Sequence, residues 1–327
     1  MGLMRGNSPA MRSLLGLTVS IGLGYCVYRV VRAHQRKKQH QGCVGTGSIR
    51  GPSASEKVSV SASDLEPHHL EKLIDILATS SDISLQEQVL VTLCNSAAFS
   101  RNQDIIRNLG GIAVIGNILS GCSQQAKVHA LNALNNLSMN LQNQEIIKDY
   151  INQTCNNICS TSLNSEVQLA GLRLVINMSV TDNYHNLVVA HLPIFLFLLE
   201  EGNTNTQIYS LKVLVNLSAN PDMTTILLTS KAPQSLTSIF NSCINRDILV
   251  RALTFVANLS KQLKSDSGCN GLFDYDKNSI YNLLFEDASS LQDNLAALFQ
   301  YPNVEVKEQV SRILINWPGL RPLNYRI

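Results

Sequence analysis

Residues 130–138 read A-L-N-A-L-N-N-L-S, and the same apolar frame returns about every 40 residues along this 327-residue chain. In each copy an asparagine follows a leucine by five residues and a leucine or valine by two residues. We call these five residues the ladder asparagines; they stand at positions 95, 136, 177, 216 and 258, in steps of 41, 41, 39 and 42 residues. Self-similarity at this period is typical of helical repeats that stack into a solenoid. The sequence therefore predicts an all-α solenoid.

A sixth, atypical repeat follows the five regular ones. Glu305-Val306 stands eleven residues before Asn316, which is the spacing that a Glu-Val pair also has in the third repeat. Residues 261–279 are polar and contain glycine, so an insertion loop is expected between the fifth and sixth repeats. The predicted domain of about six repeats spans residues 63–320, and residues 321–327 form a C-terminal tail.

The N-terminal region has the features of a membrane anchor. Residues 13–28 are uncharged, and a helix of this length measures about 24 Å, somewhat short of the ~30 Å hydrocarbon core of a bilayer. No small-x-small cleavage site follows, which argues against a cleaved secretory signal. We expect an N-terminal segment at 1–12, one transmembrane signal anchor at 13–31 and a flexible basic, Gly- and Ser-containing linker at 32–62. The basic flank that keeps the following chain in the cytosol consists of Arg29, Arg32, Arg36, Lys37 and Lys38.

The ladder asparagines also bear on the compartment. Four of them begin Asn-X-Ser sequences, which are glycosylation acceptors in the secretory lumen: Asn136, Asn177, Asn216 and Asn258. A glycan does not fit between packed helices, so the repeat domain is expected on the cytosolic side. A short, weakly apolar anchor with a basic flank is typical of the mitochondrial outer membrane, and the endoplasmic reticulum membrane is the alternative.

Catalytic, metal and nucleic-acid sites find little support in the sequence. The histidines lack ligand spacing, and no glycine-rich phosphate loop or nucleophile motif occurs. The eight cysteines include no C-x-x-C pair, and Cys94, Cys155 and Cys159 are expected to be small buried side chains. The first 50 residues carry eight basic and no acidic residues, whereas the remainder has 18 basic against 24 acidic residues, which disfavours nucleic-acid binding by the repeats. We therefore predict a non-enzyme with no cofactor, metal, nucleic acid or small-molecule substrate.

The frame at 130–138, together with Gly-Gly-Ile at 110–112, resembles the armadillo repeat, including the asparagine of its third helix. The resemblance covers about residues 64–318. The segment G-Y-C-V-Y-R-V-V-R at 24–32, followed by a short linker and about six repeats, is similar to the Alex-related armadillo proteins of the mitochondrial surface. This resemblance implies a right-handed superhelical solenoid, a role in mitochondrial distribution and dynamics through the Miro and Trak transport adaptors, and a role in cell growth and survival.

The resemblance also implies a binding site, because the third helices of armadillo solenoids line a concave groove. An asparagine amide supplies both a donor and an acceptor, so a row of amides matches the backbone of an extended peptide. Alternatively, each asparagine bonds the backbone of the neighbouring repeat and binds no ligand. The position four residues before each ladder asparagine should face the same groove, one turn away.

That second series of positions argues against one class of cargo. It holds Val91, Asn132, Arg173, Lys212 and Thr254. Nuclear-import armadillo proteins commonly carry tryptophan there, so recognition of basic import signals is disfavoured. Arg173 and Lys212 favour an acidic or phosphorylated partner. The predicted groove residues are Asn95, Asn132, Asn136, Arg173, Asn177, Lys212, Asn216 and Asn258.

These features predict a membrane-anchored, cytosol-facing adaptor that binds partner proteins through its groove. The alternative is a soluble cytosolic or nuclear scaffold, made when the anchor is not used, that regulates a transcription factor.

Overall fold

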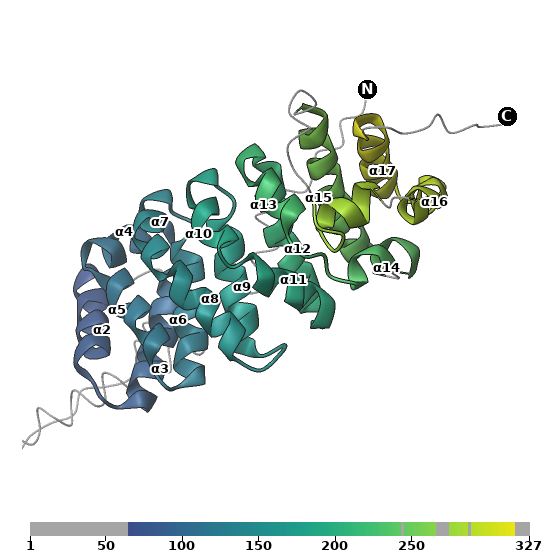
Figure 1. Ribbon diagram of the computed structural model, residues 1–327. Coiled ribbons are helices and arrows are strands. Elements are labelled where there is room, and N and C mark those ends of the chain that lie inside the picture. The colour runs from purple at the N-terminus through teal and green to yellow at the C-terminus, as the bar shows by residue number, and fades with distance from the viewer. Residues whose placement is uncertain (1–64, 243–244, 266–274, 287–288, 318–327) are drawn as a thin grey trace, which may run out of the picture. The chain divides into compact units, whose positions relative to one another are not determined.

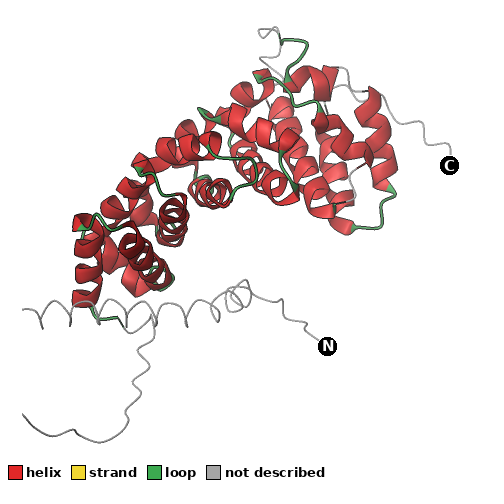
Figure 2. Ribbon diagram, turned by 90° about the horizontal axis from the view of Figure 1, so that it is seen from below, coloured by secondary structure: helices red, strands yellow, loops and turns green. Residues whose placement is uncertain are grey.

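The computed structural model describes residues 65–242, 245–265, 275–286 and 289–317, and the predicted anchor, linker and C-terminal tail lie outside them. The chain divides into two compact units, unit 1 (Met1–Ile147) and unit 2 (Lys148–Ile327), each treated by itself below. Figure 2 shows that helices dominate both. Within the described ranges the only β-type pairing is an isolated bridge between Lys231 and Ser279. None of the helices described is both long and apolar enough to cross a membrane. The all-α prediction is confirmed.

Unit 1 consists of short helices that pack as the repeat period predicts (Figure 1). Asp82 and Ser123 begin two of them: their side chains accept hydrogen bonds from the backbone N–H groups of Leu85 and Ala126. Gly110, at φ 71°, takes the left-handed conformation that separates two helices. The elements are α2 (Pro67–Thr79), α3 (Ile83–Ser96), α4 (Ser100–Asn108), α5 (Gly111–Asn117), η2 (Ile118–Ser120), α6 (Gln124–Leu137) and α7 (Leu141–Ile147).

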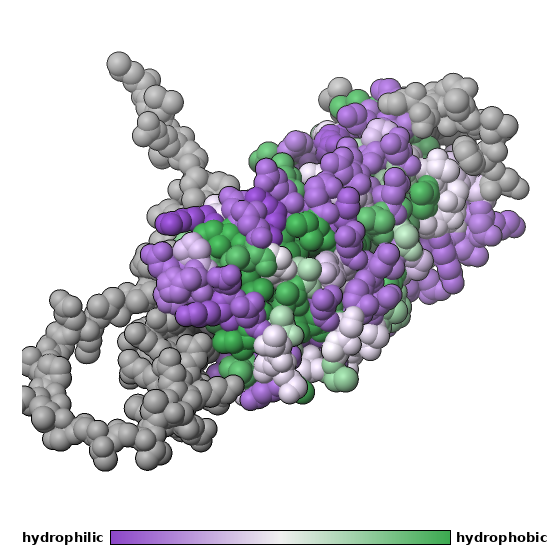
Figure 3. Space-filling model, turned by 90° about the vertical axis from the view of Figure 1, so that its left-hand side faces the viewer, coloured by the Kyte–Doolittle hydropathy of each residue, from purple (hydrophilic) through white to green (hydrophobic). Residues whose placement is uncertain are grey.

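The first repeat of unit 1 contributes two helices to the described part of the chain, α2 and α3, whereas the fourth and fifth repeats, in unit 2, contribute three α-helices each. Figure 3 looks onto the side of the molecule on which α2 lies and shows apolar residues there, bordered by polar ones. The side of the molecule on which α2 lies therefore exposes apolar residues.

Unit 2 contains the remaining repeats. Its third helices are α9, α12, α15 and α17, and each packs against the next. The second helices α8, α11, α14 and α16 each pack against the third helix of the same repeat. The elements are η3 (Lys148–Tyr150), α8 (Ile151–Ser160), α9 (Glu166–Met178), η4 (Asp182–Tyr184), α10 (His185–Val189), α11 (Leu192–Glu201), α12 (Thr204–Ala219), η5 (Pro221–Met223), α13 (Thr224–Thr229), α14 (Ser235–Ser242), α15 (Arg246–Ser265), the π-helical turn η6 (Asn282–Glu286), α16 (Ser289–Phe299) and α17 (Val304–Asn316).

The recurring leucines form the core between these helices. Leu172, Leu211 and Leu253, each five residues before a ladder asparagine, are all 0% exposed. Burying one such side chain contributes about 1.5–3 kcal/mol. Gly171, just before Leu172, lets α8 and α9 approach closely, because a Cβ atom there would lie 2.6 Å from Cγ1 of Ile158. The small residue that usually precedes the leucine in each repeat has a packing role of this kind.

Two expectations need correction. Helix α15 runs to Ser265, so the first five residues of the predicted loop 261–279 are helical, because the apolar side chain of Leu263 remains buried. Cys94 and Cys159 were expected to be buried, like Cys155, but Cys94 is partly exposed and Cys159 is exposed. The reason is that Cys159 lies in the last turn of α8, at the edge of an open cavity. Helix α17 contains both Glu305 and Asn316, the residues whose spacing indicated a sixth repeat.

Candidate functional site

The third helices of unit 2 share one open side. In α12, Lys212 and Asn216 are partly exposed, whereas Leu211 and Leu214 are 0% exposed. Helix α11 packs against α12, and α9 and α15 flank it, so Lys212 and Asn216 lie on the side that remains. The equivalent positions of the other third helices are partly exposed as well.

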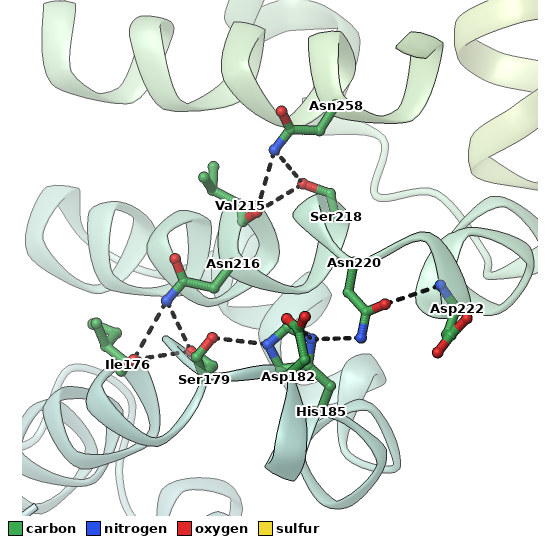
Figure 4. A network of polar contacts seen from close by, with 10 residues as sticks. All are labelled: Ile176, Ser179, Asp182, His185, Val215, Asn216, Ser218, Asn220, Asp222 and Asn258. Carbon is green, nitrogen blue, oxygen red and sulfur yellow. Dashed lines mark hydrogen bonds and ion pairs between the residues drawn. The ribbon is translucent and has the colours of Figure 1, made fainter. Parts of the chain in front are cut away.

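The amide nitrogens of the ladder asparagines bond the preceding repeat. Nδ2 of Asn216 donates to the carbonyl of Ile176 at 3.3 Å, and Nδ2 of Asn258 donates to the carbonyl of Val215 at 3.4 Å (Figure 4). In unit 1, Nδ2 of Asn136 donates to the carbonyl of Cys94 at 3.0 Å. Each acceptor belongs to the residue directly before the previous ladder asparagine. In these three asparagines, the donor half of the amide therefore holds neighbouring third helices together.

In unit 2, a serine two residues after the preceding ladder asparagine completes the contact. Ser179 and Ser218 accept the second hydrogen bond from Asn216 and Asn258, at 3.0 and 3.1 Å. The two hydroxyls donate in turn to the same carbonyl groups, those of Ile176 and Val215, at 3.0 and 2.9 Å. The repeated Asn-X-Ser sequence thus encodes a contact between repeats. The Asn-X-Ser repeat was visible in the sequence, but the hydrogen bonds that its serine makes were not.

The amide oxygens differ from one repeat to the next. Oδ1 of Asn216 has no hydrogen-bond partner among the residues with described positions. Oδ1 of Asn258, in contrast, accepts from Nη2 of Arg312 at 2.9 Å. Asn316 does not continue the ladder, because its Nδ2 donates within its own helix to the carbonyl of Arg312 at 2.8 Å. In the sixth repeat, Arg312 makes the contact to the preceding asparagine.

A pair of basic residues lies on this open side. Lys212 places Nζ 5.2 Å from the centre of the Tyr209 ring. Burial, followed by the positive charge of Arg251, lowers the pKa of Lys212 below its ordinary value, and Asp247 opposes this effect. Nε of Arg251 is buried and has no hydrogen-bond partner in the described structure. Asp247 forms its ion pair with Arg246, at 3.9 Å.

A buried histidine supports the backbone beneath Asn216. His185 is 1% exposed; its Nε2 lies 2.8 Å from the carbonyl of Ser179, and its Nδ1 lies 3.2 Å from Nδ2 of Asn220 (Figure 4). A carbonyl only accepts, so Nε2 carries the proton and Nδ1 accepts from the amide. In unit 1 the same six-residue contact is made by Gln144, which donates to the carbonyl of Ser138 at 2.7 Å.

The structure places all the predicted groove residues on third helices, and all are partly exposed. Asn95 lies on α3 and Asn132 and Asn136 on α6 in unit 1; Arg173 and Asn177 lie on α9, Lys212 and Asn216 on α12 and Asn258 on α15 in unit 2. The basic flank Arg29, Arg32, Arg36, Lys37 and Lys38 lies outside the described residues. The sequence prediction missed Arg251 and Arg312. Arg312 is four residues before Asn316 and so belongs to the second series of positions, whereas Arg251 is seven residues before Asn258.

A second concave feature of unit 2 is an open, largely apolar cavity of about 430 Å³. It lies between α8 and α11, where the 56%-exposed Phe197 and the exposed Cys159 contribute to its walls. It contains none of the ladder asparagines.

Comparisons with known proteins agree with this geometry. A family model described as Armadillo-like matches residues 65–285. A designed armadillo repeat protein in complex with the peptide (KR)4 superimposes with a TM-score of 0.62 at 15% identity, covering 76% of this chain and 99% of the designed one. Computationally designed armadillo repeat proteins for modular peptide recognition give 0.61 at 15% identity, with 76% and 100% covered. An engineered protein gives 0.60 at 19% identity, with 76% and 96% covered.

Proposed function

The chain belongs to the armadillo-like family, and on that premise we propose that it is a protein-binding scaffold that captures an extended segment of a partner protein along the third helices of unit 2. The observation that carries this proposal is the unpartnered Oδ1 of Asn216 on the open side of α12, among the residues described. Asn216 is partly exposed, so a peptide N–H that reaches this oxygen replaces a water molecule as its hydrogen-bond donor. The designed relative in complex with (KR)4 supports a peptide ligand for this fold.

The contacts within unit 2 restrict how the capture takes place. Nδ2 of Asn216 already donates to Ile176 and Ser179, so the atom of this amide that has no partner in the described structure is its oxygen. A peptide main chain therefore binds here as a donor. This differs from the bidentate amide contact that the resemblance implies.

We further propose that residues 13–31 anchor the scaffold in the mitochondrial outer membrane with its repeats in the cytosol. The uncharged run 13–28, its basic flank and the Asn-X-Ser sequences of the repeats support this. The endoplasmic reticulum membrane is the alternative site. By resemblance to the Alex-related proteins, the partners proposed are the Miro and Trak adaptors, and the process is mitochondrial distribution and dynamics, with an effect on cell growth and survival. A soluble scaffold that regulates a transcription factor is the second candidate.

A photo-crosslinking experiment tests the binding surface. Benzoylphenylalanine replaces Tyr209 on the open side of α12 or, in a matched variant, Phe197 at the apolar cavity. Both replacements keep an aromatic ring at a position that is not fully buried. Partner proteins crosslinked from position 209 and not from position 197 support the proposal. Crosslinks from position 197 alone move the binding surface to the cavity and refute it.

Imaging tests the anchor. A fluorescent fusion of the full chain should mark the mitochondrial surface, and a fusion lacking residues 1–38 should be diffuse. A reticular signal for the full chain selects the endoplasmic reticulum instead. Identical diffuse signals from both fusions refute the anchor.

A further inference from the structure

We propose that Lys212 and Arg251 together form a binding site for an anionic side chain of the captured segment, beside a main-chain contact at Asn216. This inference rests on the proposed function and specifies the chemistry of the partner. The ligand is an extended peptide that carries aspartate, glutamate or a phosphorylated residue. Arg251 is the new element of this site, because its place two helical turns before Asn258 lies outside both repeated series of positions.

Lys212 and Arg251 are neighbouring positive charges, and no carboxylate of the described residues is in contact with either. Lys212 comes from α12 and Arg251 from α15, and these helices pack against each other. Asp247, the acid whose charge acts on Lys212, is paired with Arg246. No ion pair of Lys212 or Arg251 occurs in the described parts of the chain. Like charges held this close repel each other, and a bound anion removes that repulsion.

Arg251 also has a hydrogen-bonding reason to bind an anion. Its Nε is inaccessible to solvent and no group in the described structure accepts from it. A buried N–H without an acceptor is unfavourable, and a guanidinium presents its N–H groups in a fork that fits a carboxylate or phosphate. Since a ligand cannot reach a solvent-inaccessible atom either, binding has to turn the guanidinium outwards, and the anionic side chain then supplies the missing acceptor.

Lys212 is held in place for the same ligand. Its ammonium group lies over the ring of Tyr209, which fixes the otherwise mobile side chain. Burial and Arg251 lower its pKa, so the protonated lysine is less stable here than in water. An anion between the two residues stabilises the protonated form.

Arg312 determines which ladder asparagine makes the main-chain contact. Its guanidinium already donates to Oδ1 of Asn258, which uses one of the two lone pairs of that oxygen, whereas Oδ1 of Asn216 has no partner among the described residues. The main-chain contact therefore falls at Asn216, with the anionic side chain directed towards Lys212 and Arg251. A basic peptide such as (KR)4, which a designed relative binds, meets positive charge here and is disfavoured.

Fluorescence anisotropy with the purified full-length chain tests the proposal. The probes are a labelled peptide of alternating Glu and Ser, its Gln-for-Glu counterpart, a phosphoserine version of the counterpart and (KR)4. We expect the Glu or the phosphoserine peptide to bind at least tenfold more tightly than the Gln peptide. Tighter binding of phosphoserine identifies a phosphorylated partner, and preference for Glu identifies a carboxylate partner.

Variants connect the preference to the two residues. Arg251→Met and Lys212→Met should each weaken binding of the preferred anionic peptide about tenfold or more, and Arg251→Lys should lose less than Arg251→Met. Lys307→Met is the matched control, because Lys307 is exposed and stands five residues before Arg312, nearly on the opposite side of α17. The double variant Lys212→Glu with Arg251→Glu should instead prefer (KR)4. Circular dichroism verifies that each variant keeps its helices.

The outcomes separate this inference from the proposed function. Equal binding of the Glu, phosphoserine and Gln peptides, or a preference of the unmodified chain for (KR)4, overturns the anion site. If crosslinks from position 209 persist in that case, the groove function stands and only its charge preference is refuted. If no partner is crosslinked from position 209, the groove function itself fails.

Discussion

Replacing Asn216 with alanine separates the structural role of the ladder from its binding role. The substitution removes two hydrogen bonds, to the carbonyl of Ile176 at 3.3 Å and to the hydroxyl of Ser179 at 3.0 Å. At about 1 kcal/mol net for each neutral bond, the loss is about 2 kcal/mol. Alanine regains about 0.5 kcal/mol of helix propensity over asparagine. We therefore expect the free energy of unfolding to fall by about 1.5 kcal/mol.

Urea unfolding followed by far-ultraviolet circular dichroism measures this change through the midpoint concentration. Asn156→Ala is the control, because Asn156 is exposed in the middle of α8 and belongs to no ladder contact. The control should be unchanged or slightly stabilised. If Asn216→Ala behaves like the control, the contact between α9 and α12 contributes nothing to stability. The asparagines would then be retained for binding alone, and the account of the Asn-X-Ser sequence given above would be wrong.

Three further predictions concern other residues of the same surface and core. Arg312→Met removes a charge-assisted hydrogen bond to Asn258. Because Arg312 is partly exposed, the free energy of unfolding should fall by only about 1–2 kcal/mol. Urea unfolding measures this change, and an unchanged midpoint contradicts the prediction. Burial raises the pKa of Cys155 to about 12. In the folded protein, iodoacetamide should therefore leave Cys155 unmodified and react with the exposed thiols of Cys122 and Cys159. Peptide mass spectrometry measures the modification of each cysteine. The pKa of Lys212 is lowered in the free protein and its protonated form binds the anion, so affinity for the anionic peptide should begin to fall at a lower pH than it would for an ordinary lysine. Anisotropy across the alkaline range measures this, and an onset at or above the ordinary lysine pKa refutes it.

The sequence predicted the parts of the fold that depend on residue spacing within a repeat. The leucines and asparagines recur at fixed distances, and a helix converts such distances into a buried and an exposed side, so the places of Leu211 and Asn216 followed from the period alone. The prediction that Cys159 is buried was wrong because its helix ends beside an open cavity. The four-residue spacing from Cys155 does not reveal this cavity.

The candidate site was only partly predictable for a related reason. Arg312 reaches Asn258 across 54 residues of sequence that include the insertion, so no regular spacing connects them. The two partners of Asn216, Ile176 and Ser179, lie 40 and 37 residues earlier, and their role depends on how closely α9 and α12 pack. Contacts of this kind are set by helix packing, which a single sequence does not specify.

The contacts of Asn216 and Asn258 in unit 2 have the same direction: the donor lies on the later helix and the acceptors lie on the earlier one. Nδ2 of Asn216 in α12 donates to acceptors of α9, and Nδ2 of Asn258 in α15 donates to acceptors of α12, so in both contacts the later helix relies on the earlier one. Truncation from the C-terminal end therefore leaves Asn216 and, where α15 is kept, Asn258 with their acceptors, while loss of α9 removes both acceptors of Nδ2 of Asn216. In a chain whose stability is a sum of nearest-neighbour terms, damage should then spread towards the C-terminus. Shortened versions that end after α15 should retain more cooperative unfolding than versions that begin after α9.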